Sequence, residues 1–377
     1  MAVIFVPKES APGETRVSAI PETVKGMTKL GLEVQIERGA GAAAGFSDAE
    51  FESAGGKLVD ASARGTADIV LGIQCPSVEQ AKAQKQGSIL ICTLTPGQRL
   101  DEMAALRDAK VSAMGLEFMP RITRAQKMDI LSSQATCGGY QAVLLAAVHL
   151  PKMFPLMMTA AGTLTPAKVL VLGVGVAGLQ AISTARKLGA IVEANDIRPA
   201  CKEQVESLGA KFVDTGAPPD AETSGGYAKE ASAEFLRKQR EILSAHIAQS
   251  DVLITTALVP GKKAPVLVTA DMRKGMKPGS VIVDMAAAQG GNVEGTVPGQ
   301  RAVVDGVTII GDTNLPGQCA ADASRTYARN VLAFFGEFIK DGKTNVVMDH
   351  EILGAVTIVH DGTVRHEPTA QAMAKGS

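Results

Sequence analysis

Apolar and polar positions divide the chain into two blocks, each with short apolar runs between helix-like stretches. In residues 1 to about 118, we predict strands at Val3–Val6, Val34–Glu37, Ile69–Ile73, Ile89–Leu94 and Ser112–Met114. Helical patterns separate them, among them Ser18–Gly31 and Pro96–Ala109. Strands that alternate with helices are typical of a parallel sheet, so this block predicts an α/β domain.

The second block repeats the alternation with more apolar strands. We predict these strands at residues 168–173, 190–196, 211–214, 251–258, 280–286 and 307–314. Helical patterns between them cover Leu179–Leu188, Lys202–Leu208 and Ala231–Ala248. Near-continuous apolar runs suit strands that are covered on both faces. The block therefore predicts a doubly wound nucleotide-binding domain.

The last segment predicts a helix around Ala320–Ile339 and a strand pair around 352–366 that turns at Asp361–Gly362. We expect the helix to return to the first domain. The fold class is then α/β, with two Rossmann-like domains built on parallel sheets and the second domain inserted into the first. The expected boundaries are 1–125 plus 315–377 for the first domain and 133–312 for the second. The late strand pair is either a dimer element or an edge hairpin of a monomer.

Composition and charge narrow the function classes. The formal net charge of −1, without a basic run, gives no reason to expect nucleic acid as a partner. Residues 140–162 are the most apolar, but His149, Lys152 and two prolines interrupt them, so we predict a buried helix and a connector rather than a membrane span. Five scattered cysteines suit a reducing cytosol. No metal-ligand spacing is evident, so no metal is expected.

A glycine motif identifies a candidate cofactor site. Gly173, Gly175 and Gly178 form G-x-G-x-x-G between a predicted strand and a predicted helix, and Asp196 ends the next strand 18 residues later. The glycines allow a sharp turn, close approach of a pyrophosphate, and tight packing of helix against sheet. Asp196 can accept hydrogen bonds from an adenosine ribose, which favours NAD over NADP, although Arg198 close by could accommodate a 2′-phosphate.

Other cofactor contacts are expected around these motifs. Thr256 and its neighbours follow the fourth strand, where a ligand would lie, although simple capping of the strand end would also explain them. A polar loop at 217–235 has the composition of a mobile lid. The further candidates for cofactor binding are Val176, Ala177, Ile197, Arg198, Tyr227, Thr256, Ala257 and Leu258.

Several segments together carry a family resemblance. They are "MPRITRAQKMDILSSQ", "VLVLGVGVAGLQAISTARKLGAIVEANDIRP", "KEQVESLGAKFV", "GGYAKE", "TTALVPGKKAPVLV", "MKPGSVIVDMA" and "TNLPGQCAADAS". Through nearly its whole length the chain resembles the NAD(H)-binding component, domain I, of proton-translocating nicotinamide nucleotide transhydrogenases, in the form of the separate alpha subunit of the split bacterial enzyme. Alanine dehydrogenase is the related family with the same architecture.

The resemblance implies a role for the polar stretch at 120–134. In the transhydrogenases this stretch holds the nicotinamide end of NAD(H), which points to Arg121, Gln126, Asp129 and Ser132 as catalytic-site residues. A polar helix start with ordinary capping is the alternative interpretation.

The resemblance also implies partners and a location. We expect a homodimer, a membrane-spanning subunit and a separate NADP(H)-binding subunit, and hence a cytoplasmic chain attached peripherally to the inner membrane through them. The implied enzyme is a proton-translocating NAD(P)+ transhydrogenase of the Si-specific/Re-specific class. In it NADH reduces NADP, and the transfer is coupled to inward proton movement in the membrane component.

The related alanine dehydrogenases need groups that this chain lacks. The resemblance aligns their substrate arginine with Arg16, their lysine with Gln74, their histidine with Thr93 and their aspartate with Ala288. Neither an amide nor an alcohol is a general acid near neutral pH, so amino-acid dehydrogenation is disfavoured. Hydride transfer between two nicotinamides needs alignment rather than acid–base groups. A stand-alone alanine dehydrogenase-like oxidoreductase and a non-catalytic NAD-sensing module remain as alternatives.

Overall fold

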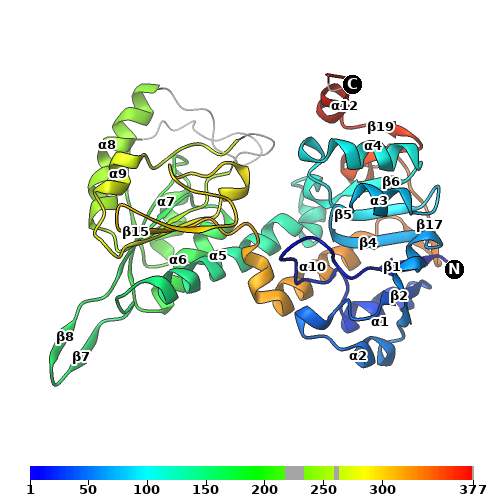
Figure 1. Ribbon diagram of the computed structural model, residues 1–377, viewed down its shortest axis with the longest axis horizontal. Helices are drawn as coiled ribbons and strands as arrows, with labels where there is room; N and C mark the ends of the chain where they lie inside the picture. The colour runs from blue at the N-terminus through cyan, green and yellow to red at the C-terminus, as the bar shows by residue number, and fades with distance from the viewer. Residues whose placement is uncertain (217–232, 259–262, 376–377) are drawn as a thin grey trace. The chain divides into compact units, whose positions relative to one another are not determined.

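The computed structural model describes residues 1–216, 233–258 and 263–375 (Figure 1). The chain divides into two compact units. Unit 1 consists of residues 1–134 and 317–377, and unit 2 of residues 135–316. Unit 2 is thus inserted in the sequence of unit 1. Over the described residues, no helix combines the length and the apolar character that crossing a membrane requires.

Unit 1 is built on an eight-stranded sheet in the order β19-β18-β6-β5-β4-β1-β2-β3. The strands are β1 (Val3–Val6), β2 (Glu33–Glu37), β3 (Lys57–Val59), β4 (Ile69–Gln74), β5 (Ile89–Thr93), β6 (Ser112–Gly115), β18 (Thr357–His360) and β19 (Thr363–Val364). Strands β1 to β6 are parallel, and β18 and β19 extend the sheet antiparallel. The predicted parallel α/β sheet is confirmed, with an antiparallel edge.

Helices cover both faces of this sheet. They are α1 (Pro21–Lys29), α2 (Asp48–Ser53), α3 (Val78–Lys82), α4 (Leu100–Asp108), α10 (Ala320–Phe335), α11 (Glu351–Val356) and α12 (Glu367–Lys375). One core joins α1, α2, α10 and α11 to the sheet, and the other joins α3, α4 and α12. Tyr327 of α10 is fully buried, and its hydroxyl donates to the carbonyl of Gly72 in β4 (2.8 Å).

Unit 2 has a seven-stranded sheet in the order β11-β10-β9-β12-β13-β15-β14. Its strands are β9 (Lys168–Leu172), β10 (Ile191–Asn195), β11 (Lys211–Phe212), β12 (Val252–Thr255), β13 (Val281–Asp284), β14 (Arg301–Val304) and β15 (Val307–Ile310). All pairs are parallel except β14 with β15. Because the chain order reverses between β9 and β12, these two strands mark the topological switch point, where ligands bind in such sheets.

The helices of unit 2 form two layers. They are α5 (Ile130–His149), whose first residues belong to unit 1, α6 (Val176–Lys187), α7 (Cys201–Ser207), α8 (Ala233–Gln249) and α9 (Ala270–Lys274). Helices α5, α6 and α7 pack on one face of the sheet, and α8 and α9 pack on the other. The predicted doubly wound domain is confirmed.

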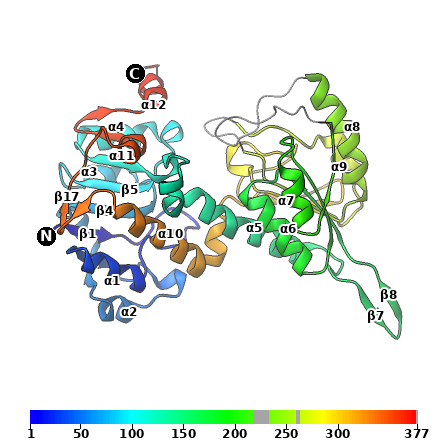
Figure 2. The ribbon, with the colours of Figure 1, turned by 180° about the vertical axis from the view of Figure 1, so that it is seen from behind.

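Two local predictions were wrong. The connector expected after the apolar helix instead contains a hairpin of β7 (Met157–Thr159) and β8 (Gly162–Leu164), which projects from the rest of unit 2 (Figures 1 and 2). The strand expected from residue 352 begins only at Thr357, because α11 precedes it. His350 caps α11 by accepting a hydrogen bond from the Leu353 amide (3.3 Å). A further small pair is β16 (Ile339–Lys340) with β17 (Lys343–Thr344).

Candidate functional site

The glycine turn after β9 is packed so closely that side chains would not fit. Gly173 has a φ of +96°, and a Cβ there would lie 2.7 Å from Thr256 Oγ1. A Cβ on Gly178 would lie only 2.0 Å from the carbonyl oxygen of Gly173. Both glycines therefore serve the turn and the close contact between α6 and the sheet.

Gly175 has a different environment. It precedes the first residue of α6, and no described heavy atom lies within 4 Å of a Cβ built on it, apart from its chain neighbours. No side chain of the described residues caps this helix start. The N–H groups of the first turn, including those of Val176 and Ala177, lack intrahelical partners and carry a partial positive charge. This open, uncapped helix start suits phosphate oxygens.

Asp196, which follows β10, is already engaged by the protein. Its Oδ2 accepts from the Val174 amide and Arg198 Nη2 (both 2.8 Å), and its Oδ1 accepts from the Arg198 amide and Nε (both 2.9 Å). Burial opposes ionisation, but these bonds and the guanidinium charge outweigh it and hold the pKa of Asp196 below its usual value. The four bonds fill the ordinary acceptor positions of the carboxylate, so a ribose hydroxyl would have to displace Arg198. Ile197 lies half-buried between the two.

The segment after β12 packs directly against the glycine turn. Thr256 donates from its amide to the Leu172 carbonyl (2.8 Å) and from its hydroxyl to the Gly173 carbonyl (2.9 Å). Thr255 is buried, and its hydroxyl donates to Asp284 (3.0 Å), as strand-end capping requires. Leu258 is exposed.

An asparagine that the sequence did not single out fixes this segment. The side chain of the fully buried Asn292 accepts from the Ala257 amide (3.0 Å) and donates to the carbonyls of Ala257 (2.9 Å) and Pro265 (2.8 Å). It thereby joins the two ends of the loop between these residues. Nothing in the local sequence "QGGNVEG" distinguishes such an anchor from an ordinary turn asparagine.

The predicted residues of the polar stretch lie in unit 1. Arg121 and Gln126 are exposed, the latter in a 3₁₀ helix at Thr123–Met128. Asp129 precedes α5 and accepts hydrogen bonds from the Ser132 amide (3.0 Å) and hydroxyl (2.6 Å). This is ordinary helix capping, so Asp129 and Ser132 have a structural role whatever else they bind.

The counterparts of the alanine dehydrogenase substrate groups also meet in unit 1. Gln74 and Thr93 are register partners at the carboxyl ends of β4 and β5. The buried Arg16 pairs with Glu14 through two bonds (2.8 and 2.6 Å) and donates to Gln134 (2.7 Å). Gln74 donates to the same Glu14 (2.9 Å). Ala288 belongs to unit 2.

Glu9 adds an acidic group that the sequence did not single out. It follows β1, and its carboxylate accepts from the amide of Ile73 (2.6 Å) and more weakly from that of Gln74 (3.4 Å). Burial, with a smaller contribution from the charge of Glu14, raises the pKa of Glu9 to about 7, against the opposing effect of the backbone bonds. Unit 1 therefore holds a carboxyl that titrates near neutral pH.

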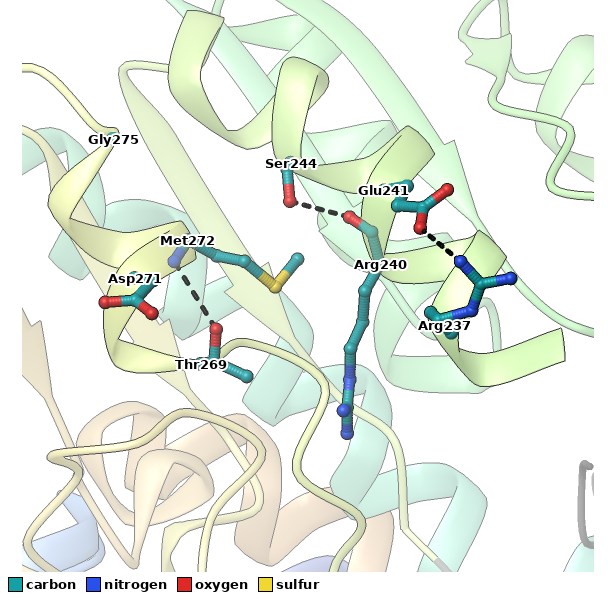
Figure 3. A pocket seen from close by; sticks show the side chains of 8 residues that line it. All are labelled: Arg237, Arg240, Glu241, Ser244, Thr269, Asp271, Met272 and Gly275. Atoms are coloured by element: carbon teal, nitrogen blue, oxygen red, sulfur yellow. Dashed lines mark hydrogen bonds and ion pairs between the residues drawn. The ribbon is translucent and has the colours of Figure 1, made fainter. Parts of the chain in front are cut away.

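A surface pocket of about 430 Å³ lies between α8 and α9 in unit 2 (Figure 3). In it Arg237 pairs with Glu241 (3.1 Å), and Arg240 extends beside Met272. None of its lining residues is a predicted site residue. Tyr227, the predicted lid residue, lies outside the described residues. Across the described ranges, no three His, Cys, Asp or Glu side chains gather as metal ligands.

These features define a Rossmann-like α/β protein. The model of the alanine dehydrogenase/PNT N-terminal domain matches residues 5–138, and that of the C-terminal domain matches residues 142–367. An NAD(P) transhydrogenase alpha subunit of Rhodospirillum rubrum is 47% identical over 374 residues, which is 96% of this chain and 97% of that protein. The crystal structure of a transhydrogenase from Sinorhizobium meliloti is similar, with a TM-score of 0.86 and 42% identity over 97% of this chain and 99% of that one.

A more distant relative belongs to the other branch. The alanine dehydrogenase of Halomonas elongata is 29% identical over 379 residues, covering 98% of this chain and 96% of that protein. The chain belongs to the alanine dehydrogenase/PNT family, and its relatives with higher identity are NAD(P) transhydrogenase alpha subunits.

Glu9 generates a pH prediction. Because its pKa in the folded chain, about 7, lies above the unfolded value near 4.5, the folded state binds the extra proton between these values. Its contribution to stability is complete below pH 4.5 and is lost as the pH rises through 7. Allowing for partial exposure, the loss is about 2 kcal/mol. Denaturant unfolding from pH 4.5 to 8 should show this slope in the wild type and a flatter one in Glu9→Gln.

The matched control is Glu52→Gln, an exposed site in the same unit. It should keep the wild-type slope. Equal slopes in all three proteins would contradict the assignment of the titration to Glu9.

Proposed function

We propose that this chain is the NAD(H)-binding subunit of a proton-translocating transhydrogenase of the Si-specific/Re-specific class. The proposed reaction moves a hydride between NAD(H) on this chain and NADP(H) on a partner subunit. In one direction NADH and NADP⁺ give NAD⁺ and NADPH, so two electrons and one proton move together as the hydride. Proton translocation would take place in a membrane-spanning partner, with this subunit attached peripherally to the inner membrane.

The observation that carries the proposal is the polar group around Arg16. In a family whose dehydrogenase branch uses a lysine and a histidine, Gln74 and Thr93 stand at the paired strand ends. Neither side chain transfers protons near neutral pH. Hydride transfer between two nicotinamides needs no such transfer, only alignment and exclusion of water. The 47% identity to a transhydrogenase alpha subunit supports the same assignment.

In this proposal the cofactor is held in three places. The uncapped start of α6, with Gly173, Gly175, Val176, Ala177 and Gly178, takes the pyrophosphate. Asp196, with Ile197 and Arg198, takes the adenosine ribose. The remaining contacts, at the nicotinamide side, come from Thr256, Ala257, Leu258, Arg121, Gln126, Asp129 and Ser132. When bound, the dihydronicotinamide supplies the hydride, and the task of these side chains is to fix its orientation.

The runner-up is an alanine dehydrogenase-like oxidoreductase, which Glu9 favours because its carboxyl titrates near pH 7. Mixing the chain with NADH and an NADP⁺ analogue, with and without a purified NADP(H)-binding subunit, separates the alternatives. Partner-dependent hydride transfer is expected. Pyruvate- and ammonia-dependent oxidation of NADH by the chain alone would support the runner-up. Binding of NADH without either activity would support an NAD-sensing module.

We also propose that the chain forms a homodimer through the β7–β8 hairpin. All six strand residues of the hairpin are exposed, and Met158 and Leu164 keep 81% and 48% of their surface in solvent. A lone two-stranded hairpin is marginally stable in water, and its unpaired edges are templates for another strand. At its base a hollow of about 770 Å³ is lined by Met153, Phe154 and Pro155, among others. A second copy would cover these apolar groups.

Gln126→Ala tests the nicotinamide-side assignment. The exposed amide is proposed to act where the two nucleotides meet, so its loss should lower the rate of partner-dependent hydride transfer at least tenfold. NADH affinity, measured by NADH fluorescence, should change less than threefold. The neighbouring Lys127→Ala, also exposed, should leave both quantities near wild type. Parallel losses of rate and affinity in Gln126→Ala would remove the proposed role.

Asp196→Ala tests the ribose assignment. Loss of a charged hydrogen-bond acceptor costs about 1.5–3 kcal/mol, so NADH should bind roughly 10- to 100-fold more weakly. The same change releases Arg198 from its carboxylate, so the preference for NADH over NADPH should narrow. Glu193→Ala on the same strand removes a carboxylate that contacts Lys211 and His246 instead, and should leave both affinities unchanged. Wild-type NADH affinity in Asp196→Ala would show that the ribose binds elsewhere.

Met158→Asp tests the dimer. A charge on the exposed hairpin should oppose burial against a second copy, and sedimentation equilibrium should show a shift from dimer to monomer. Val303→Asp is the matched control, since Val303 on the edge strand β14 is also mostly exposed. If Met158→Asp remains dimeric, the hairpin is not the interface.

A further inference from the structure

Helices α5 and α6 approach each other most closely at a single glycine. A Cβ built on Gly139 of α5 would lie 2.2 Å from the carbonyl oxygen of Ala177 and 3.1 Å from its Cα. Real Cβ atoms essentially never approach another heavy atom within 3.0 Å, and the obstacle is backbone. Any side chain at position 139 therefore has to push the two helices apart.

The preceding glycine has a different environment. A Cβ on Gly138 would lie 3.0 Å from Cε of Met285 and 3.8 Å from the ring of Pro316. The nearest atom is the end of a flexible side chain, which can rotate away. An alanine at position 138 thus fits after a small adjustment, whereas one at position 139 does not.

The contact with Gly139 falls on the part of α6 that the candidate site uses. Ala177 is the second residue of α6, in the turn whose N–H groups point to the open space beside Gly175. On its other side this turn is held by the close packing of Gly178 against the Gly173 carbonyl. The first turn of α6 is thereby fixed between α5 and the glycine turn after β9.

We propose that Gly139 is a positioning residue for the phosphates of a dinucleotide. It touches no ligand, but its missing side chain lets α5 set the place of the N–H groups that would bind the pyrophosphate. The inference rests on the proposed function, since it assumes that NAD(H) binds at α6. Hydrogen bonds from N–H groups need donor–acceptor distances of about 2.7–3.2 Å, so a shift of α6 by roughly 1 Å would weaken them.

The experiment compares Gly139→Ala with Gly138→Ala. Both substitutions place an alanine in a helix interior, where it is intrinsically better than glycine, so helix propensity does not separate them. NADH affinity is measured by fluorescence titration, and folding by circular dichroism and thermal unfolding. Gly138→Ala should bind NADH as the wild type does. Gly139→Ala should remain helical and bind NADH at least tenfold more weakly.

A phosphate-free ligand separates positioning from general damage. Adenosine, which has the ribose but no pyrophosphate, should bind Gly139→Ala within threefold of the wild type by NMR titration. Equal weakening of adenosine and NADH, or wild-type NADH affinity in Gly139→Ala, would overturn the inference. If the wild type does not bind NADH, the proposed function fails instead, and this is seen before any variant is compared.

Hydrogen exchange of the wild type provides a test that does not depend on the variant folding. NADH should slow exchange of the amides at 174–179 and also of those at 137–141 in α5. Amides of α8 at 241–249, on the other face of the sheet, should not change. Protection confined to 174–179 would overturn the inference.

Discussion

Close approach of backbone to backbone at the start of α6 is the constraint on which the candidate site depends. Gly178 lies against the Gly173 carbonyl, and Thr256 bonds to that same carbonyl from the neighbouring strand end. These contacts leave no room for side chains, and they join β9, β12 and α6 at the switch point of the sheet. Among the described residues of this turn, Gly175 borders the open space from which a ligand can approach the N–H groups.

The two units divide the chemistry between them. Unit 2 provides an uncapped helix start and an acidic strand end, which suit a dinucleotide. Unit 1 provides a buried arginine whose charge Glu14 balances, surrounded by amides and hydroxyls. An arginine that is already paired with a carboxylate offers less to a substrate carboxylate. The combination favours a chain that orients a cofactor over one that processes a small acid.

Much of the fold followed from the sequence, because the strands of both sheets are apolar runs covered on two faces. β9 and β12 are such runs, and the glycine motif between strand and helix identified α6. The β7–β8 hairpin was missed because its residues form no alternating pattern and pack on nothing in their own unit. α11 was taken for a strand because "ILGAV" suits either structure, and its cap is an unusual one, His350.

The site was predictable where a short motif carries the chemistry, and less so where partners are distant in sequence. Gly173 and Asp196 were identified from spacing. Asn292 and Glu9 were not, since their partners lie 27–35 and 64–65 residues away. The saturation of Asp196 by Arg198 was also unpredictable, because two residues of separation do not specify whether the charges pair.

That pairing bears on how quickly a nucleotide could leave. If the adenosine ribose binds at Asp196, as proposed, the Arg198 guanidinium is a tethered competitor for the same carboxylate oxygens, present at a high local concentration. Each departing ribose would be replaced at once by the side chain, so the carboxylate never waits uncompensated. Such a device trades equilibrium affinity for rapid exchange of oxidised for reduced cofactor, which suits a carrier that must reload after every transfer.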